Sequence, residues 1–235
     1  MRYKHIYKAT FLTRPNRFIA KVLLDGREEI VHVKNTGRCK ELLVPGCTVY
    51  LERSDKPERK TAYDLVTVEK AVPQGVRLIN MDSQAPNRLF EEWAKGGKFV
   101  PGLTLLRSET SWGHSRFDFY WEAESTGAEG RRGFVEVKGC TLEEGGWTYF
   151  PDAPTERGVK HLEELVSAGA QGFETAVCFV IQMSGVKGFS PNDRTHPEFG
   201  KALRRAALEG VKVLAYECEV QVGEVRMTKP VPIRL

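Results

Sequence analysis

The chain has 235 residues, of which 41% are hydrophobic and 28% charged, so it is long enough for one large or two modest domains with a packed core. No stretch reaches the roughly 18 consecutive apolar residues that a membrane helix needs, and the polar N-terminal segment has no hydrophobic signal region. We therefore expect a cytoplasmic protein without membrane association. The five cysteines form no CxxC pair, which argues against disulfide bonds and a zinc site.

The positive charge is concentrated near the N-terminus. The net charge is +4, yet residues 1–85 carry 16 Lys and Arg against 10 Asp and Glu, whereas residues 86–235 carry 19 against 21. A basic first third is typical of a protein that attracts an acidic polymer such as nucleic acid. The alternative is a basic surface that only confers solubility.

The first 80 residues predict short strands separated by turns. Apolar residues alternate before the Asp25-Gly26 turn, and residues 37–43 suit one short helical turn. The expected strands are 18–24, 30–33, 48–53, 63–70 and 76–79. Five short strands favour a small closed barrel of the OB type, which commonly binds single-stranded nucleic acid. The usual helix of that fold is missing between the third and fourth of these strands.

After residue 82 the pattern changes to alternating helices and strands. A helix is expected to begin near Pro86 and to end at Gly96-Gly97, and further helices are expected at 155–168 and 196–209. Strands are expected at 103–109, 116–121, 134–138, 173–182 and 211–217, with 173–182 central because it is apolar throughout. We predict an α/β (α+β) protein with an OB-like domain at 1–82 and a mixed sheet with flanking helices at 83–235.

Two carboxylates and a lysine are expected to lie together on this sheet. In the strand 134–138, Glu136 and Lys138 share one face because side chains alternate with a period of two. Asp118 precedes them on a strand joined by a loop of hairpin length around Gly127 to Gly133. Neighbouring carboxylates repel unless a cation lies between them, so Asp118 and Glu136 predict a Mg²⁺ or Mn²⁺ site. An ion pair on an edge strand is the alternative.

A stiff loop follows and enters a helix. The segment Phe150 to Gly158 contains three consecutive polar or charged residues, and Thr155 is placed to cap the helix that follows. We expect Arg157, Lys160 and His161 to stay off the apolar stripe of this helix and to contact phosphate near its N-terminus. Two more acidic residues, Glu91 and Glu109, are candidates for a metal shell, although a surface position is the simpler interpretation.

Several motifs together resemble the sugar fermentation stimulation protein A family. They are Asn35-Thr36-Gly37-Arg38 followed by Pro45-Gly46, Ser115 to Phe119, Glu136-Val137-Lys138-Gly139, Phe150 to Gly158 through His161, Phe189-Ser190-Pro191 and Gly210-Val211. The resemblance covers nearly the whole chain. It implies an N-terminal OB-like domain, a C-terminal PD-(D/E)XK nuclease-like domain, DNA binding, and a regulatory role in sugar (maltose) metabolism genes. The nuclease pattern corresponds to Asp118, Glu136 and Lys138.

Two hypotheses about function remain open from the sequence. The first is a nuclease that depends on Mg²⁺ or Mn²⁺, with Asp118, Glu136 and Lys138 as catalytic residues; the second is a non-catalytic DNA-binding regulator. A carbohydrate-acting enzyme with an acid–base pair is disfavoured, because Lys138 suits a phosphate better. Whether the DNA is single- or double-stranded, and whether the chain forms a homodimer, stay open. The residues expected to bind nucleic acid are Arg14, Arg17, Arg38, Arg116, Arg157, Lys160 and His161.

Overall fold

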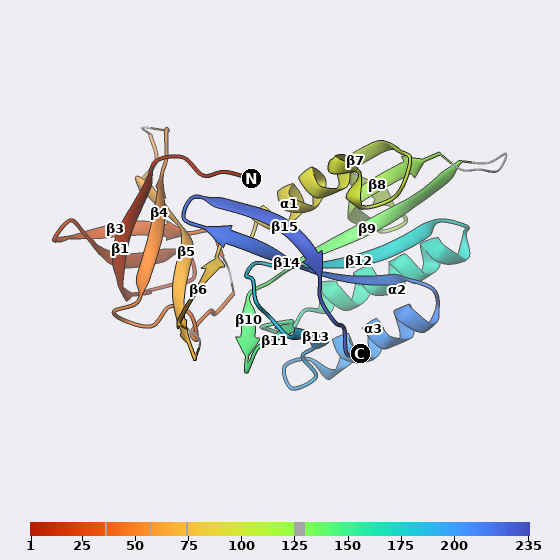
Figure 1. Cartoon of the computed structure of the whole chain (residues 1–235). Helices are drawn as coiled ribbons and strands as arrows, with labels where there is room; N and C mark the ends of the chain where they lie inside the picture. Colours follow the sequence, from red (N-terminus) through yellow and green to blue (C-terminus); the bar gives the residue numbers. More distant parts are fainter. Residues whose placement is uncertain (36, 57, 74, 125–129) are drawn as a thin grey trace.

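The structure is a computed structural model, and it describes residues 1–35, 37–56, 58–73, 75–124 and 130–235. Thr36 of the expected motif and Gly127 of the expected hairpin loop lie outside the described residues. The chain forms a barrel from its first third and a mixed sheet with helices from the rest (Figure 1). The two parts lie side by side, and the β14–β15 hairpin of the sheet reaches toward the barrel.

The first 80 residues form six short strands, five of which close the barrel. They are β1 (Ile6–Thr13), β2 (Ile19–Leu24), β3 (Arg27–Val33), β4 (Thr48–Arg53), β5 (Tyr63–Val72) and β6 (Gly75–Asn80). The order β3-β2-β1-β4-β5 closes through a parallel pairing of β3 with β5, and β6 extends the sheet beyond β5. Inward side chains such as Val22, Val31 and Leu65 are completely buried. The predicted OB-type barrel is confirmed.

The prediction missed the first barrel strand and counted β6 in its place. β1 does alternate, with Ala9 and Phe11 buried between more exposed neighbours, but Lys8 and two threonines weaken its apolar signal. With β1 included, the third and fourth strands are separated by residues 34–47. That segment holds the predicted helical turn, in which Leu43 N donates to Cys39 O at 2.9 Å. The sequence analysis therefore looked for the helix of the OB fold one strand too late, because it had not counted β1.

The second part is built on a mixed six-stranded sheet. Its strands are β7 (Leu103–Trp112), β8 (Ser115–Ala123), β9 (Arg131–Cys140), β12 (Glu174–Ile181), β14 (Lys212–Gln221) and β15 (Glu224–Pro230), in the order β15-β14-β12-β9-β8-β7. β12 pairs in parallel with both β9 and β14 and is almost wholly buried, as its apolar run predicted. The strand β15 was not predicted.

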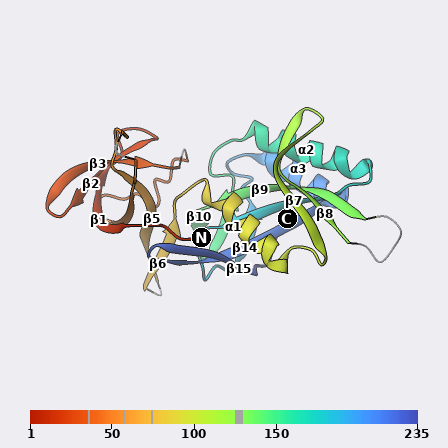
Figure 2. The same cartoon turned by 90° about the horizontal axis from the view of Figure 1, so that it is seen from above.

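Helices cover both faces of this sheet (Figure 2). On one face lies α1 (Ala85–Trp93), which buries Leu89 and Phe90 and continues into the π-helical turn η1 (Ala94–Lys98). On the other face lie α2 (Glu156–Ala170) and α3 (Pro197–Leu208), which pack on each other and on the sheet. The predicted helices are confirmed, and no described helix is long and apolar enough to cross a membrane.

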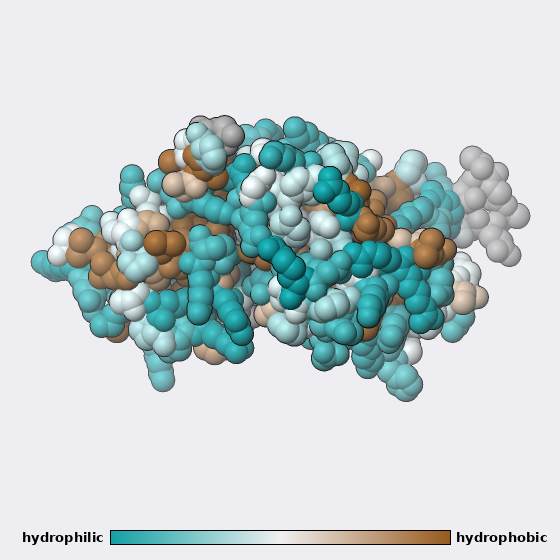
Figure 3. All heavy atoms as spheres, turned by 90° about the horizontal axis from the view of Figure 1, so that it is seen from below, coloured by the Kyte–Doolittle hydropathy of each residue, from teal (hydrophilic) through white to brown (hydrophobic). Residues whose placement is uncertain are grey.

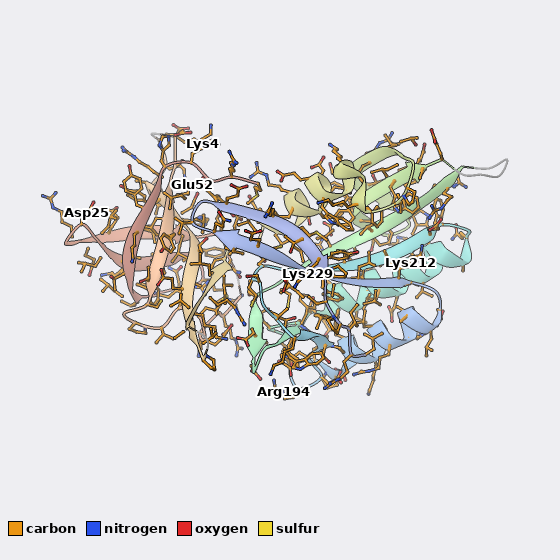
Figure 4. All side chains as sticks on the ribbon, viewed as in Figure 1. Lys4, Asp25, Glu52, Arg194, Lys212 and Lys229 are labelled. Carbon is orange, nitrogen blue, oxygen red and sulfur yellow. The ribbon has the colours of Figure 1, made fainter. Side chains whose placement is uncertain are left out.

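A small three-stranded sheet lies below the junction of the two parts. It consists of β10 (Leu142–Glu144), β11 (Trp147–Phe150) and β13 (Gly188–Pro191), with β11 parallel to β13. Figure 4 shows Arg194 at the outer edge of this region, where its guanidinium pairs with Glu144 at 2.5 Å. The sequence did not predict this sheet, since its strands are only three or four residues long.

Buried polar side chains join the barrel to the sheet. Gln182 Nε2 donates to Asn80 Oδ1 at 2.8 Å and to Asp82 O at 2.9 Å, and Asn80 Nδ2 donates to the hydroxyl of Tyr3 at 2.8 Å. Tyr3 N donates to Gly223 O, so the first residues of the chain lie against the β14–β15 hairpin. A polar, satisfied junction of this kind fixes one relative placement of the two parts.

The face seen from below is mainly hydrophilic. In this view teal atoms predominate, and brown hydrophobic atoms lie over the barrel and, in smaller patches, over the second part of the chain (Figure 3). Exposed apolar side chains of the barrel include Phe18, Ile30 and Val76. Scattered apolar residues of this kind are normal on a protein surface, so they do not by themselves mark a binding site.

Candidate active site

The candidate site forms where β8 and β9 begin to separate. The strands pair antiparallel, as predicted, and their last backbone pair before the site is Phe119 with Val135. Beyond it, the carboxylate of Asp118 accepts a hydrogen bond from Val137 N at 2.8 Å in place of a backbone partner. Phe117 and Phe119 belong to apolar clusters on opposite sides of the sheet. Strict alternation would place them on one side, so the strand is irregular at Asp118.

Asn87 of α1 fixes the second oxygen of Asp118. Its Nδ2 donates to Asp118 Oδ1 at 2.8 Å. Burial of the carboxyl and the charge of Glu136 raise the pKa of Asp118, and the hydrogen bonds from Val137 N and Asn87 oppose this shift only in part. The two carboxylates therefore interact, as the sequence predicted. The sequence analysis did not identify Asn87, and only its position in the first turn after Pro86 signals a role.

Glu136 lies on β9 and is only 3% exposed. Its Oε1 accepts hydrogen bonds from the ammonium of Lys138, at 2.5 Å, and from Nδ1 of His161. Its Oε2 is buried and has no hydrogen-bond partner among the described residues. Burial by itself raises the pKa of Glu136, but the hydrogen bonds from His161 and Lys138 and the charge of Lys138 outweigh it, so the pKa is lowered. Glu136 is held as an anion with one oxygen unsatisfied.

His161 was expected off the apolar stripe of its helix, and that expectation is wrong. The buried residues of α2 are Gly158, His161, Leu162, Leu165 and Ala168, spaced three or four apart. His161 lies on that stripe because it packs under the sheet, where it reaches the carboxylate of Glu136. Its Nε2 accepts from Arg157 Nε at 3.2 Å, so Nδ1 carries the proton that it donates to Glu136.

The other predicted cations of this region are exposed. Arg157 and Lys160 extend from the solvent side of α2, where Lys160 Nζ contacts His114 O at 3.3 Å. Arg116 on β8 pairs with Glu109 at 3.3 Å. Glu91 pairs with Lys95 at 2.6 Å, so both extra acidic candidates are engaged by surface cations.

The three predicted arginines of the barrel form a separate group. Arg14 donates to four backbone carbonyls, those of Gly37, Arg38, Arg17 and Asn35, and so fastens the loop around residue 37. Arg17 and Arg38 are exposed beside it.

This loop presses against the segment that leads into α2. A Cβ atom added to Gly37 would lie 2.3 Å from Oδ2 of Asp152, so only glycine allows the approach. The contact explains two motifs of the sequence at once, the glycine after Thr36 and the aspartate after Pro151, because each supplies one side of it.

The donor set suits a hard divalent cation. Asp118 and Glu136 Oε2 are carboxylate oxygens, the ligand type that Mg²⁺, Mn²⁺ and Ca²⁺ prefer. Among the described residues no group of three or more His, Cys, Asp and Glu is arranged to hold a metal ion. An ion at this site would therefore rely on two carboxylates and on water, which suits Mg²⁺ because it keeps several of its waters.

Comparison with known proteins gives a consistent result for both parts of the chain. The family model "Sugar fermentation stimulation protein RE domain" matches residues 84–224, and the model "SfsA N-terminal OB domain" matches residues 12–80. The sugar fermentation stimulation protein homolog of Ruminiclostridium cellulolyticum is 50% identical over 235 residues, covering 100% of both chains. The homolog of Desulfitobacterium hafniense (strain DSM 10664 / DCB-2) is 53% identical over 235 residues, covering 100% of this chain and 99% of that protein.

A solved structure is similar over the same length. The structure of Pyrococcus furiosus SfsA in complex with Ca²⁺ aligns with a TM-score of 0.87 at 26% identity, covering 100% of this chain and 98% of that one. The similarity therefore includes the barrel, the mixed sheet and their connection.

Proposed function

This chain belongs to the sugar fermentation stimulation protein family, and from that premise we propose that it binds DNA and hydrolyses phosphodiester bonds with Mg²⁺ or Mn²⁺. Asp118, Glu136 and Lys138 are the proposed catalytic residues, on a mixed sheet that we assign to the PD-(D/E)XK nuclease fold. The observation that carries the proposal is the unpartnered, buried Oε2 of Glu136 beside Asp118. The Ca²⁺ complex of the Pyrococcus furiosus relative supports the binding of a divalent cation.

Each side chain of the site has a role in this reaction. Asp118 and Glu136 hold the cation, which when bound stabilises charge on the phosphate and favours ionisation of a water. Lys138 stays on the same face of β9 as Glu136, where its ammonium faces the phosphate oxygens. Asn87 orients the carboxylate of Asp118, and His161 orients that of Glu136. The free oxygen of Glu136, Oε2, is thereby already directed at the cation site before the reaction begins.

The barrel supplies a second surface for DNA. OB barrels bind single strands by combining a positively charged groove with stacking residues. Here Arg17 and Arg38 are exposed on the loops next to Asp152, close to the start of α2. We propose that these arginines and Arg157 contact the phosphates on either side of the bond that is cut.

The proposal is tested by incubating the full chain with circular single-stranded and double-stranded DNA in Mg²⁺, Mn²⁺ or EDTA. We expect cleavage that requires metal and that Glu136→Gln lowers by about a hundredfold or more. Glu163→Gln is the matched control, since it makes the same change on the exposed side of α2. Binding without cleavage in every metal would instead favour the non-catalytic DNA-binding regulator.

The electrostatic part is tested separately by a salt titration. The logarithm of the DNA affinity is expected to fall steeply with the logarithm of the salt concentration if several phosphates are contacted. Arg38→Gln is expected to reduce this slope by about one unit. A flat response would show that the basic first third does not bind phosphates.

A further inference from the structure

An exposed aromatic ring lies at the start of the second barrel strand. Phe18 directly precedes β2 and is 54% exposed. Strand alternation would place it inward with Ala20, Val22 and Leu24, which are all buried. No other phenylalanine, tyrosine or tryptophan among the described residues is as exposed. The ring of Phe18 is therefore available to a ligand.

The other aromatic residues of the barrel strands have contacts within the fold. Phe11 is 2% exposed and Tyr50 is 9% exposed, so both lie in the interior. The rings of Tyr7 and Tyr63 pack edge to face, with their centroids 5.5 Å apart. Phe18 thus differs from the rest of the barrel aromatics, because most of its surface is left to solvent.

The backbone around Phe18 is fixed by hydrogen bonds. Phe18 N donates to Asn16 Oδ1 at 2.9 Å, and Phe18 O accepts from Val33 N at 2.7 Å. The same oxygen of Asn16 accepts from Ile19 N at 3.0 Å. A ring on a fixed backbone loses little conformational entropy when it binds a ligand, since the phenylalanine side chain has few rotatable bonds.

The two loops on this side of the barrel are basic. Residues 13–18 and 34–40 together contain five Lys and Arg and no Asp or Glu. Among these cations, Arg17, Arg38 and Lys40 are exposed. A positive surface beside an exposed aromatic ring is the combination with which proteins bind single-stranded nucleic acid, because the cations hold the backbone while the ring stacks on a base.

Direct contacts connect this region to the start of α2. Arg14 donates to the carbonyl of Arg17 at 2.7 Å, next to Phe18 in the chain, and to the carbonyl of Gly37 at 2.9 Å. Gly37 in turn lies against Asp152, in the segment that leads into α2. The ring therefore belongs to the part of the barrel that faces the candidate site.

We propose that Phe18 stacks on an unpaired base, and that the barrel therefore binds single-stranded DNA in preference to double-stranded DNA. The inference rests on the proposed function for its DNA ligand. In a duplex each base is covered on both faces by its neighbours, so the ring reaches only a base that is unstacked. The basic loops favour a nucleic acid over a second copy of this surface, because like charges repel.

The test measures binding of the full chain, by fluorescence anisotropy in EDTA, to a labelled single strand of about 15 nucleotides, to its duplex, and to an abasic strand of the same length. The wild type is expected to bind the single strand most tightly. Phe18→Leu should weaken this binding about tenfold and leave the other two affinities unchanged, because leucine is apolar but cannot stack. Phe18→Trp should keep the single-strand affinity. Val76→Ala is the matched control, since Val76 is 64% exposed on β6.

The salt dependence separates stacking from charge. The slope of the logarithm of affinity against the logarithm of salt concentration should be equal for the wild type and Phe18→Leu, since no phosphate contact is lost. Stacking is overturned if Phe18→Leu binds the single strand as tightly as the wild type, or loses as much affinity for the duplex or the abasic strand. A dimer that dissociates in Phe18→Leu, with DNA binding unchanged, would also overturn it by assigning the ring to a second copy.

The outcomes distinguish this inference from the proposed function. If the stacking result is obtained but no metal supports cleavage, Phe18 stands as a base-stacking residue and the proposed hydrolysis fails. If DNA is bound and cleaved without any dependence on Phe18, the inference fails alone. If none of the strands is bound, both fail.

Discussion

His161 lies between two charged side chains, the carboxylate of Glu136 and the guanidinium of Arg157. Each ring nitrogen has one partner, and Nδ1 is directed at Glu136 Oε1. Oε1 also accepts a hydrogen bond from Lys138, so Oε2 is the oxygen of Glu136 that remains available for a cation or water. Carboxylates that bind metal ions in proteins are usually held in place by hydrogen bonds from surrounding side chains, and His161 makes such a bond here.

We predict that His161→Phe weakens the binding of Ca²⁺ or Mn²⁺ by about 10- to 100-fold, because the ring then lacks the donor that orients Glu136. His161→Asn is expected to retain most of the affinity, since its amide N–H can replace Nδ1–H. Calorimetric titration with the metal alone measures both. Equal affinities for the wild type and His161→Phe would show that the ring only fills space.

A second residue-level prediction concerns Asp64 in the barrel, whose side chain is 4% exposed. Burial alone would raise its pKa, but hydrogen bonds from Arg59 and His32 and the charge of Lys34 lower the pKa to about 2. This value lies below that of an unfolded chain, so the ion pairs stabilise the fold above about pH 4. Their contribution of about 2 kcal/mol is lost as the pH falls toward 2.

Urea unfolding at several pH values tests this prediction. Asp64→Asn should be less stable than the wild type at pH 7, and the gap should narrow as the pH is lowered from about 5 to about 3. Asp25→Asn is the control, because Asp25 is exposed at the tip of the β2–β3 turn (Figure 4). A gap that does not change with pH would contradict the assignment.

The sequence predicted the acidic pair and the lysine because strand alternation alone places them. Period two puts Glu136 and Lys138 on one face, and a loop of hairpin length makes β8 and β9 neighbours. The partners of these residues come from helices, and their positions depend on how α1 and α2 pack on the sheet. The role of Asn87 and the burial of His161 could therefore not be predicted from the local sequence pattern.

At the scale of elements, the start of α2 sets the geometry of the site. Thr155 is the N-cap, and its hydroxyl accepts from Gly158 N at 3.1 Å. The cap fixes where the helix begins, and therefore which residues of the first two turns face the sheet. A shift of one residue would rotate His161 by about 100° away from Glu136.

Thr155→Ala is predicted to destabilise the protein by about 1 kcal/mol, because the N–H of Gly158 loses its side-chain acceptor and keeps only the carbonyl of residue 155. Thr155→Ser keeps the oxygen and should cost much less. Urea unfolding followed by circular dichroism compares the three proteins. A loss as large in Thr155→Ser as in Thr155→Ala would attribute the effect to the methyl group and not to the cap.

The strands differ in how well the sequence predicted them. Long apolar runs such as β12 were found because they are buried on both sides, whereas β10, β11 and β13 have three or four residues each. Such short strands exist because neighbouring segments hold them in place. Their prediction requires knowledge of the tertiary structure, which the periodicity of a short segment does not contain.

At the scale of the whole molecule, the relative placement of barrel and sheet depends on contacts at their junction. Gly37 of the barrel loop meets Asp152 at a distance that excludes a side chain, and Gln182 donates to Asn80 across the junction.

We predict that Gly37→Ala loosens the junction, because the new methyl group would lie 2.3 Å from Asp152 Oδ2 and 2.9 Å from Asn35 Oδ1. Faster proteolysis of the segments around residues 37 and 152 is the expected result, with a small loss of overall stability. Gly96→Ala is the control, since a Cβ atom there meets no other atom within 4 Å. Unchanged cleavage rates in Gly37→Ala would show that Asp152 moves aside without opening the junction.

The contact of the first residues with the last hairpin has a consequence for how the chain is assembled during synthesis. Arg2 bridges to Glu224, and Tyr3 N donates to Gly223 O, so residues at opposite ends of the polypeptide are joined. The barrel strands leave the ribosome first and can pair with each other at once. The segment before β1, however, must wait until residues 223 and 224 have been translated. This part of the junction therefore forms only after almost the entire chain has been translated.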